Sequence, residues 1–191
     1  MKMKRLLLFS VMGVFLGIGV AGFRLFNIEN SPAFFHNGNW IGTTNLPLGT
    51  DALITAQVTL FAMYALPSNE AVYLMSRRDS DGNRFQGSKQ YTISGNLADI
   101  KARYWSITVY GKDLYLIPNR AERFSFNNTN LVADSAGNFS IILSSDEQKG
   151  NWLPTPDNAE FNLLLRIYNG DSAFLKQLSV TPLPQVNLNK P

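Results

Sequence analysis

The chain has 191 residues, of which 45% are hydrophobic and 16% are charged, as is typical of a folded protein rather than a disordered one. Its formal net charge is +3, but Lys2, Lys4 and Arg5 supply the whole excess, because the other basic residues number 14 and balance 14 acidic ones. No stripe of Lys and Arg remains to contact phosphates, so nucleic acid is not expected as a partner. The lack of cysteine and the single histidine, His36, exclude disulfides, thiolate sites and histidine-based metal centres, and no cofactor is expected.

An apolar stretch covers residues 6–23 and is interrupted only by Ser10. A helix of about 18 residues spans roughly 27 Å, which is close to the ~30 Å thickness of the hydrocarbon core of a bilayer. The basic residues before the stretch should stay in the cytoplasm, which places the chain after residue 26 outside. We therefore expect residues 1–26 to be a single-pass anchor in the cytoplasmic membrane, with the C-terminal domain in the periplasm. The alternative is a signal peptide cleaved near Ala21, which would release the same domain.

The lead-in after the anchor, residues 27–50, is rich in Asn, Gly and Pro and is predicted to be irregular. A helix is predicted over residues 51–66, because Thr50 or Asp51 can cap its first turn and Pro67 ends it.

Beyond residue 70, apolar and polar residues alternate in short runs separated by Gly, Asn and Asp, which is the pattern of strands joined by turns. The predicted strands cover residues 71–78, 89–94, 104–110, 114–117, 139–144 and 161–168. Strands at this spacing favour an antiparallel sandwich or jelly roll over a parallel α/β sheet, which needs crossover helices. Residues 51–191 are therefore expected to form a mainly-β, sandwich-like domain with one packed helix, preceded by the transmembrane helix.

Two of the predicted strands have an apolar face and a face that mixes aromatic with hydrogen-bonding side chains. Alternate residues of a strand point to opposite faces, so the second face collects the residues Ser106, Thr108, Tyr110, Arg166 and Tyr168. If the two strands are neighbours, these residues line a polar-aromatic cleft, the usual composition of a small-ligand site. The alternative is the solvated outer face of a sheet.

Arg166 stands between two apolar residues and is the most informative of the five. A buried arginine needs a carboxylate or a ligand anion to offset the loss of its hydration. Asp146 and Glu147 are the candidate structural partners, and a ligand anion is the alternative.

Catalytic patterns are weak in this sequence. A Ser-His-acid triad needs a histidine in the cleft, and His36 lies close to the predicted membrane segment. Residues 79–83 include the acidic residues of a calcium loop, but the glycine comes too early and no glutamate closes the loop, so a hairpin turn is predicted. The neighbouring carboxylates Asp146 and Glu147 leave an enzyme open, one using carboxylate, Tyr and Arg chemistry on an envelope glycan or lipid-derived substrate.

One motif, Asn-Trp-Leu-Pro-Thr-Pro at residues 151–156, is specific enough to suggest a family. Weaker matches lie at residues 70–73, 79–82, 87, 105–110, 116–119, 123–125, 138–141 and 161–168. Through these segments, over roughly residues 40–185, the chain resembles the bacterial family catalogued as domain of unknown function 1214, in its small, membrane-anchored, single-domain form. The resemblance implies a mainly-β, sandwich-like fold and no established activity or cofactor.

Arg123 and Trp152 lie in those segments and complete the candidate ligand-binding residues. Pro154 and Pro156 stiffen the chain around the indole, which either plugs the end of the sandwich or forms one wall of a cleft. We expect an uncharacterised, non-catalytic envelope module that binds a small molecule or an envelope partner; the alternative is the enzyme described above. The sequence leaves the oligomeric state open.

Overall fold

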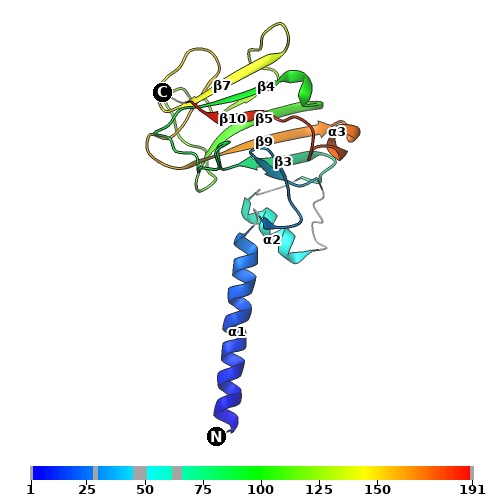
Figure 1. The fold of residues 1–191 in the computed structure, drawn as a ribbon, viewed down its shortest axis with the longest axis vertical. Coiled ribbons are helices and arrows are strands. Elements are labelled where there is room, and N and C mark those ends of the chain that lie inside the picture. The colour runs from blue at the N-terminus through cyan, green and yellow to red at the C-terminus, as the bar shows by residue number, and fades with distance from the viewer. Residues whose placement is uncertain (1, 28–29, 45–50, 62–65, 190–191) are drawn as a thin grey trace.

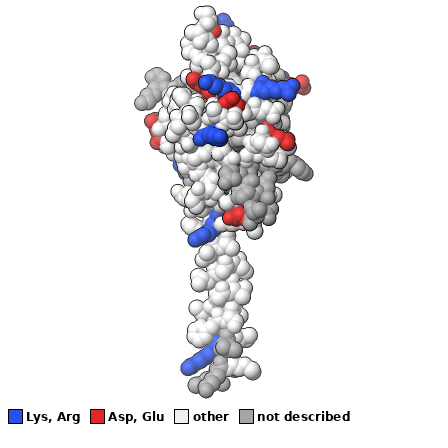
Figure 2. All heavy atoms as spheres, turned by 90° about the vertical axis from the view of Figure 1, so that its right-hand side faces the viewer, with Lys and Arg blue, Asp and Glu red and all other residues white. Residues whose placement is uncertain are grey.

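The computed structural model describes residues 2–27, 30–44, 51–61 and 66–189. Helix α1 (Lys2–Phe26) projects from a globular β domain, and helix α2 (Ala52–Phe61) lies between them (Figure 1). By length and composition α1 is apolar enough to cross a membrane, and none of its apolar stretch is buried; a signal sequence has the same properties. Figure 2 shows the helix surface uncharged along its middle, with basic groups near its two ends. The predicted apolar helix is therefore present.

The β domain consists of two sheets (Figure 1). In the larger sheet the strand order is β1 (Phe35–Asn37), β2 (Trp40–Gly42), β3 (Ala71–Ser76), β9 (Phe161–Gly170), β5 (Ala102–Gly111) and β6 (Ser125–Asn127). In the smaller sheet it is β10 (Gln185–Leu188), β4 (Tyr91–Asn96), β7 (Asn138–Ser144) and β8 (Trp152–Pro154). The paired strands are antiparallel except β7 and β8, which are parallel. A short 3-10 helix, η2 (Leu97–Asp99), and helix α3 (Ser172–Lys176) complete the described elements. The mainly-β sandwich predicted from the sequence is confirmed.

Apolar side chains from both sheets form one core. The larger sheet contributes Val72, Leu74, Trp105, Ile107, Val109, Leu163, Leu165 and Ile167, and the smaller sheet contributes Tyr91, Ile93, Phe139, Ile141, Leu143 and Leu153. At one end the rings of Phe85 and Phe161 stack with their centroids 5.1 Å apart, and Tyr91 meets both rings edge-on. Burial of these large side chains supplies the main driving force for the fold.

The predicted strands and the observed ones differ mainly where strands are short. Strands β3, β4, β5, β7 and β9 lie where strands were predicted, but residues 114–117 form no strand. Leu114 has a left-handed backbone (φ 65°) that interrupts an extended chain, and Leu116 makes a single bridge to Tyr110. The lead-in predicted to be irregular contains the β1–β2 hairpin, and β6, β8 and β10 were not predicted. Three or four residues show too little alternation to be recognised.

Helix α2 confirms part of the predicted helix, because its described portion ends at Phe61 and residues 62–65 lie outside the described chain. Asp51 caps its first turn, accepting a hydrogen bond from the Ile54 amide at 3.0 Å. Among the side chains of this helix that the structure describes, Leu53 is half-buried, and Gln57 and Val58 are buried.

Gln57 connects α2 to the end of α1. Its side chain is 1% exposed; Nε2 donates to the Arg24 carbonyl at 2.8 Å, and Oε1 accepts from the Ser31 hydroxyl at 3.3 Å. Arg24 lies in the last turn of α1, where carbonyl groups lack partners within the helix. The amide therefore satisfies a helix-end carbonyl and holds α2 against the end of α1.

Replacing this buried amide should weaken the junction. We expect Gln57→Ala to lower the free energy of unfolding by about 1–3 kcal/mol, because the buried groups it contacts lose their partner. Thermal unfolding of the full chain in detergent micelles measures the effect. Thr59→Ala, at an exposed position of the same helix, is the control and should cause no loss; equal melting temperatures for the two variants would contradict the role of Gln57.

Candidate functional site

A pocket of about 440 Å³ lies on the outer face of the larger sheet, over strands β5, β6 and β9. The face follows from the register: Ser106 pairs with Arg166 and Asn127, and Thr108 pairs with Leu164 and Ser125. Directly paired residues of antiparallel strands point to the same face, and the residues between them point into the core. The pocket is lined by Arg103, Tyr104, Ser106, Thr108, Ser125, Arg166, Tyr168 and Asn169.

The floor of the pocket carries three hydroxyl groups. Ser106 and Thr108 are 5% and 4% exposed, although both belong to the outer face, because larger side chains surround them. The hydroxyls of Ser106 and Ser125 form no hydrogen bond with any residue in the described part of the chain. Their larger neighbours thus cover both residues at the bottom of a pocket that is open to solvent.

Arg166 forms one wall and is held by neutral partners. Its Nη1 donates to the Thr108 hydroxyl at 3.2 Å, and its Nη2 donates to the Tyr110 hydroxyl. The guanidinium also lies over the Tyr110 ring, 5.3 Å from the centroid. These contacts restrict its rotamers and leave its charge uncompensated, since hydroxyls and ring faces carry no formal charge.

Two tyrosine rings form the wall beyond Arg166. Tyr104 and Tyr168 face each other across β5 and β9, with ring centroids 5.7 Å apart and an angle of 52° between their planes. Burial raises the pKa of Tyr168 above its ordinary value, and the positive charge of Arg166 opposes that rise. Its phenol therefore stays protonated at neutral pH and can donate a hydrogen bond.

The charge of the pocket is positive. Arg103 is exposed at the rim, and its guanidinium has no hydrogen bond or ion pair with the residues that the structure describes. None of the described lining residues is acidic. Two guanidinium groups, hydroxyls and phenols without a carboxylate can bind an anion, but they offer no acid-base pair.

The structure separates the seven candidate residues into two places. Ser106, Thr108, Arg166 and Tyr168 line the pocket, and Tyr110 supports Arg166. The other two residues, Arg123 and Trp152, meet near strands β6 and β8. Sequence reasoning missed Arg103, Ser125 and Asn169 as lining residues. It assigned Tyr104 to the same face by alternation but did not include it among the candidates.

Arg123 and Trp152 contact each other near the edge strands β6 and β8. Arg123 Nη1 donates to the Trp152 carbonyl at 3.2 Å, and its guanidinium lies 5.7 Å from the indole centroid. The indole is 6% exposed and donates to the Ser144 carbonyl at 2.9 Å. The core cluster contains Leu153 but not Trp152, because neighbouring residues of a strand point to opposite faces. Trp152 is therefore buried outside that core, and neither it nor Arg123 lines the pocket on the larger sheet.

The predicted carboxylate partners of Arg166 are not among its contacts. Asp146 and Glu147 are exposed in the segment after β7 and do not line the pocket. The contacts of Asp146 are local: its amide donates to the Ser144 hydroxyl at 3.2 Å. Of the two alternatives for Arg166, pairing with one of these carboxylates is not observed, and the described lining residues include none of the carboxylates that the enzyme alternative requires.

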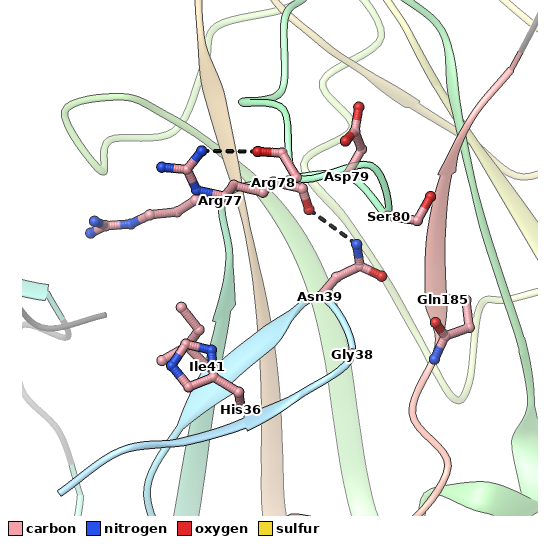
Figure 3. Close-up of a pocket in the computed structure, with 10 residues that line it drawn as sticks. His36, Gly38, Asn39, Ile41, Arg77, Arg78, Asp79, Ser80 and Gln185 are labelled. Atoms are coloured by element: carbon pink, nitrogen blue, oxygen red, sulfur yellow. Dashed lines mark hydrogen bonds between the residues drawn. The ribbon is translucent and has the colours of Figure 1, made fainter. Parts of the chain in front are cut away.

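A second pocket of about 400 Å³ lies where the β1–β2 hairpin meets the turn after β3 and strand β10 (Figure 3). Asn39 joins these parts: Nδ2 donates to the Arg78 carbonyl at 3.1 Å, and Oδ1 accepts from the Val186 amide at 3.2 Å. His36, Arg77 and Arg78 contribute positive or titratable groups, and all three have further interactions within the protein. None of these three side chains is therefore without a partner.

The segment that resembles a calcium loop forms a turn beside this second pocket. Asp79 Oδ1 accepts from the amides of Asp81 (3.1 Å) and Asn83 (2.9 Å), and the Asp79 amide donates to the Asn83 carbonyl at 2.9 Å. Figure 3 shows the Asp79 carboxylate pointing away from His36 and Ile41. No group of three or more His, Cys, Asp or Glu side chains suited to a metal occurs among the described residues. The predicted turn is confirmed.

Loss of the Arg166 side chain should destabilise the domain. Arg166→Ala removes two hydrogen bonds and a ring contact, so we expect the free energy of unfolding to fall by about 1–3 kcal/mol. Arg103→Ala, in the same pocket, should change it by less than about 0.5 kcal/mol, since that side chain has no such contacts. Thermal unfolding of both variants of the full chain in micelles tests this; an unchanged melting temperature for Arg166→Ala would show that its contacts carry no stability.

Comparisons with known proteins give one family and two similar solved structures. The sequence profile of a family described as "Protein of unknown function (DUF1214)" matches residues 70–172. The crystal structure of VPA0106 from Vibrio parahaemolyticus is similar, with a TM-score of 0.59 and 29% identity, over 75% of this chain and 37% of that one. A putative uncharacterized protein from Burkholderia cenocepacia gives a TM-score of 0.46 and 17% identity, over 87% of this chain and 39% of that one.

The chain spans well under half of the length of both solved proteins. A search of curated proteins found no match. The family profile covers more than half of the chain, including the pocket strands β5, β6 and β9. The resemblance noted in the sequence is thus confirmed, and the chain belongs to the DUF1214 family of proteins of unknown function.

Proposed function

We propose that this chain is a membrane-tethered envelope protein whose β domain lies outside the cytoplasmic membrane and binds a small anionic ligand. The ligand site is the pocket on the outer face of the larger sheet. The observation that carries the proposal is that two arginines, Arg103 and Arg166, line the pocket without a carboxylate among the described lining residues. The protein acts as a binding module rather than as an enzyme.

The pocket has the size and the chemistry of a ligand site. Its volume of about 440 Å³ falls in the range of small-ligand pockets, about 300–1,000 Å³. Ser106 presents a hydroxyl that is largely buried and has no partner in the described protein. A ligand that excludes water from this hydroxyl has to give it a partner, because an unpaired hydroxyl without water costs free energy.

The positive charge of the residues that line the pocket favours an anionic ligand over a neutral or cationic one. Arg166 is fixed by hydroxyl partners that do not neutralise it, so a bound anion would gain charge-assisted hydrogen bonds. Arg103 at the rim adds a second positive charge along the path of entry. A cation placed there would be repelled by both groups.

The tether is supported by the apolar α1 and its basic flank. Lys4 and Arg5 precede the apolar stretch, and the side that carries positive charge stays cytoplasmic. Gln57 of α2 donates to the carbonyl of Arg24 in the last turn of α1. We propose that α1 is retained as an anchor, because its apolar stretch is long enough to cross a bilayer.

Anion binding can be measured as a thermal shift of the full chain in detergent micelles. Sodium salts of acetate, benzoate and phosphate are compared with sodium chloride at equal ionic strength. We expect at least one of the three anions to raise the melting temperature of the wild type, since a ligand that binds the native state stabilises it by mass action. Arg103→Ala should reduce this shift.

The matched control for the anion experiment is Arg120→Ala. Arg120 is exposed and does not line the pocket, so its loss should leave the shift unchanged. Equal shifts in the two arginine variants, or no shift above chloride with any of the three anions, would refute the proposal.

The placement of the domain can be tested by labelling single cysteines, because the natural chain has none. Ser179 is exposed in the β domain, and Lys4 precedes the apolar stretch. In intact spheroplasts we expect a membrane-impermeant maleimide to label Ser179→Cys and to label Lys4→Cys only after lysis. The reverse pattern, or a domain found in the soluble fraction, would contradict the proposed topology or tether.

A further inference from the structure

We propose that the ligand of the outer-sheet pocket is an acidic saccharide, with its carboxylate on Arg166 and its hydroxyls on the Ser106–Thr108–Ser125 floor. This inference rests on the proposed anion-binding function and specifies the ligand class. Three features of the described pocket support it: a planar cation held in place, a hydroxyl-rich floor and a wall of two aromatic rings.

The carboxylate follows from the geometry of Arg166. Its Nη1 donates to the Thr108 hydroxyl, and its Nη2 donates to the Tyr110 hydroxyl. A guanidinium has five N–H donors, so donors remain for a ligand. The planar arrangement of these donors matches a planar carboxylate, which accepts two parallel hydrogen bonds. The contacts with Thr108 and Tyr110 hold the guanidinium in position before the ligand arrives.

The polyhydroxyl part follows from the floor. Ser106 is 5% exposed, and its hydroxyl has no partner in the described part of the protein. Thr108 accepts from Arg166, so its own O–H is free to donate. Ser125 is the cross-strand partner of Thr108, and such a pair has its Cβ atoms about 5 Å apart. Three hydroxyls thus lie together on one floor.

A ligand without hydroxyls would fit this floor poorly. An aromatic or aliphatic acid bound by Arg166 would cover the Ser106 hydroxyl without giving it a partner. A site built to hydrogen-bond a substrate discriminates strongly against an analogue that lacks the matching groups. A sugar can both donate to and accept from these hydroxyls.

The ring wall completes the match. Tyr104 and Tyr168 lie side by side, with their ring centroids 5.7 Å apart. They form a cross-strand pair of β5 and β9, next to the pair of Ser106 and Arg166. Aromatic rings provide an apolar surface with a polar tip, which suits the C–H face of a sugar ring. The phenol of Tyr168, kept neutral by its raised pKa, provides one more donor.

Calorimetric titration of the full chain in detergent micelles tests the ligand class. The probes are D-glucuronate, D-glucose, benzoate and D-glucose 1-phosphate at equal ionic strength. Glucuronate should bind at least about tenfold more tightly than each of the other three, because it alone combines the carboxylate with the hydroxyls.

The outcomes separate the ligand class from anion binding. Benzoate binding as tightly as glucuronate would overturn the saccharide, and tighter binding of the sugar phosphate would overturn the carboxylate; both would leave anion binding intact. Failure of every anion to bind would overturn the proposed function as well.

Substitution of Ser106 gives a second readout. Ser106→Ala should weaken glucuronate binding about five- to tenfold, the loss expected for one hydrogen bond. It should tighten benzoate binding or leave it unchanged, because benzoate gives the hydroxyl no partner, and it should not lower the melting temperature, because the hydroxyl has no partner in the described free domain. Ser94→Ala, at an exposed strand position of the smaller sheet, is the matched control. Unchanged glucuronate affinity in Ser106→Ala, or an equal loss in Ser94→Ala, would overturn the assignment.

Discussion

The antiparallel register of β5 and β9 determines where every group of the pocket lies. Trp105 pairs with Ile167 and Ile107 pairs with Leu165, and all four side chains are buried in the core. A shift of one residue would expose these side chains and bury Arg166, which the core could not tolerate. Burial on one face of the sheet therefore fixes the polar side chains on the other face. The pocket is built on paired strands, which position side chains more rigidly than loops do.

The neutral partners of Arg166 explain why this face of the sheet keeps a positive charge that can attract an anion. A carboxylate partner would have offset the desolvation of the guanidinium and also neutralised it. Thr108 and Tyr110 instead provide hydroxyl acceptors and a ring face. The side chain is half-buried, so water still contributes to its solvation. The result is a positive group that is fixed in place and still able to attract an anion.

Alternation along two long strands was enough to predict half of the pocket. The positions of Ser106, Thr108, Arg166 and Tyr168 on one face followed from period-two patterns in strands of ten residues. The contribution of Ser125 could not be predicted, because β6 has three residues and its pairing with β5 is a long-range contact. A strand this short carries too little pattern to reveal its neighbour.

Tertiary placement also explains why some of the expected arrangements are not observed. Arg123 and Trp152 meet near the edges of both sheets, and no local pattern shows which edges come together. The pairing of Arg166 with Asp146 or Glu147 was inferred from charge alone, whereas cross-strand neighbours supplied hydroxyl partners. The apolar helix α1 was readily predicted, because its length and composition are local properties of the sequence.

The claim that this face is an accessible, positively charged pocket can be tested most directly by charge-selective labelling. The natural chain has no cysteine, so Ser125→Cys in the pocket and Ser94→Cys on the smaller sheet each provide a single thiol. The rates of reaction with a sulfonate-bearing and a trimethylammonium-bearing methanethiosulfonate are compared at each position. We predict that the ratio of the anionic to the cationic rate is several times higher at position 125, because two guanidinium groups attract the anionic reagent. Equal ratios at the two positions, or a thiol at position 125 that does not react, would contradict a cationic pocket on this face.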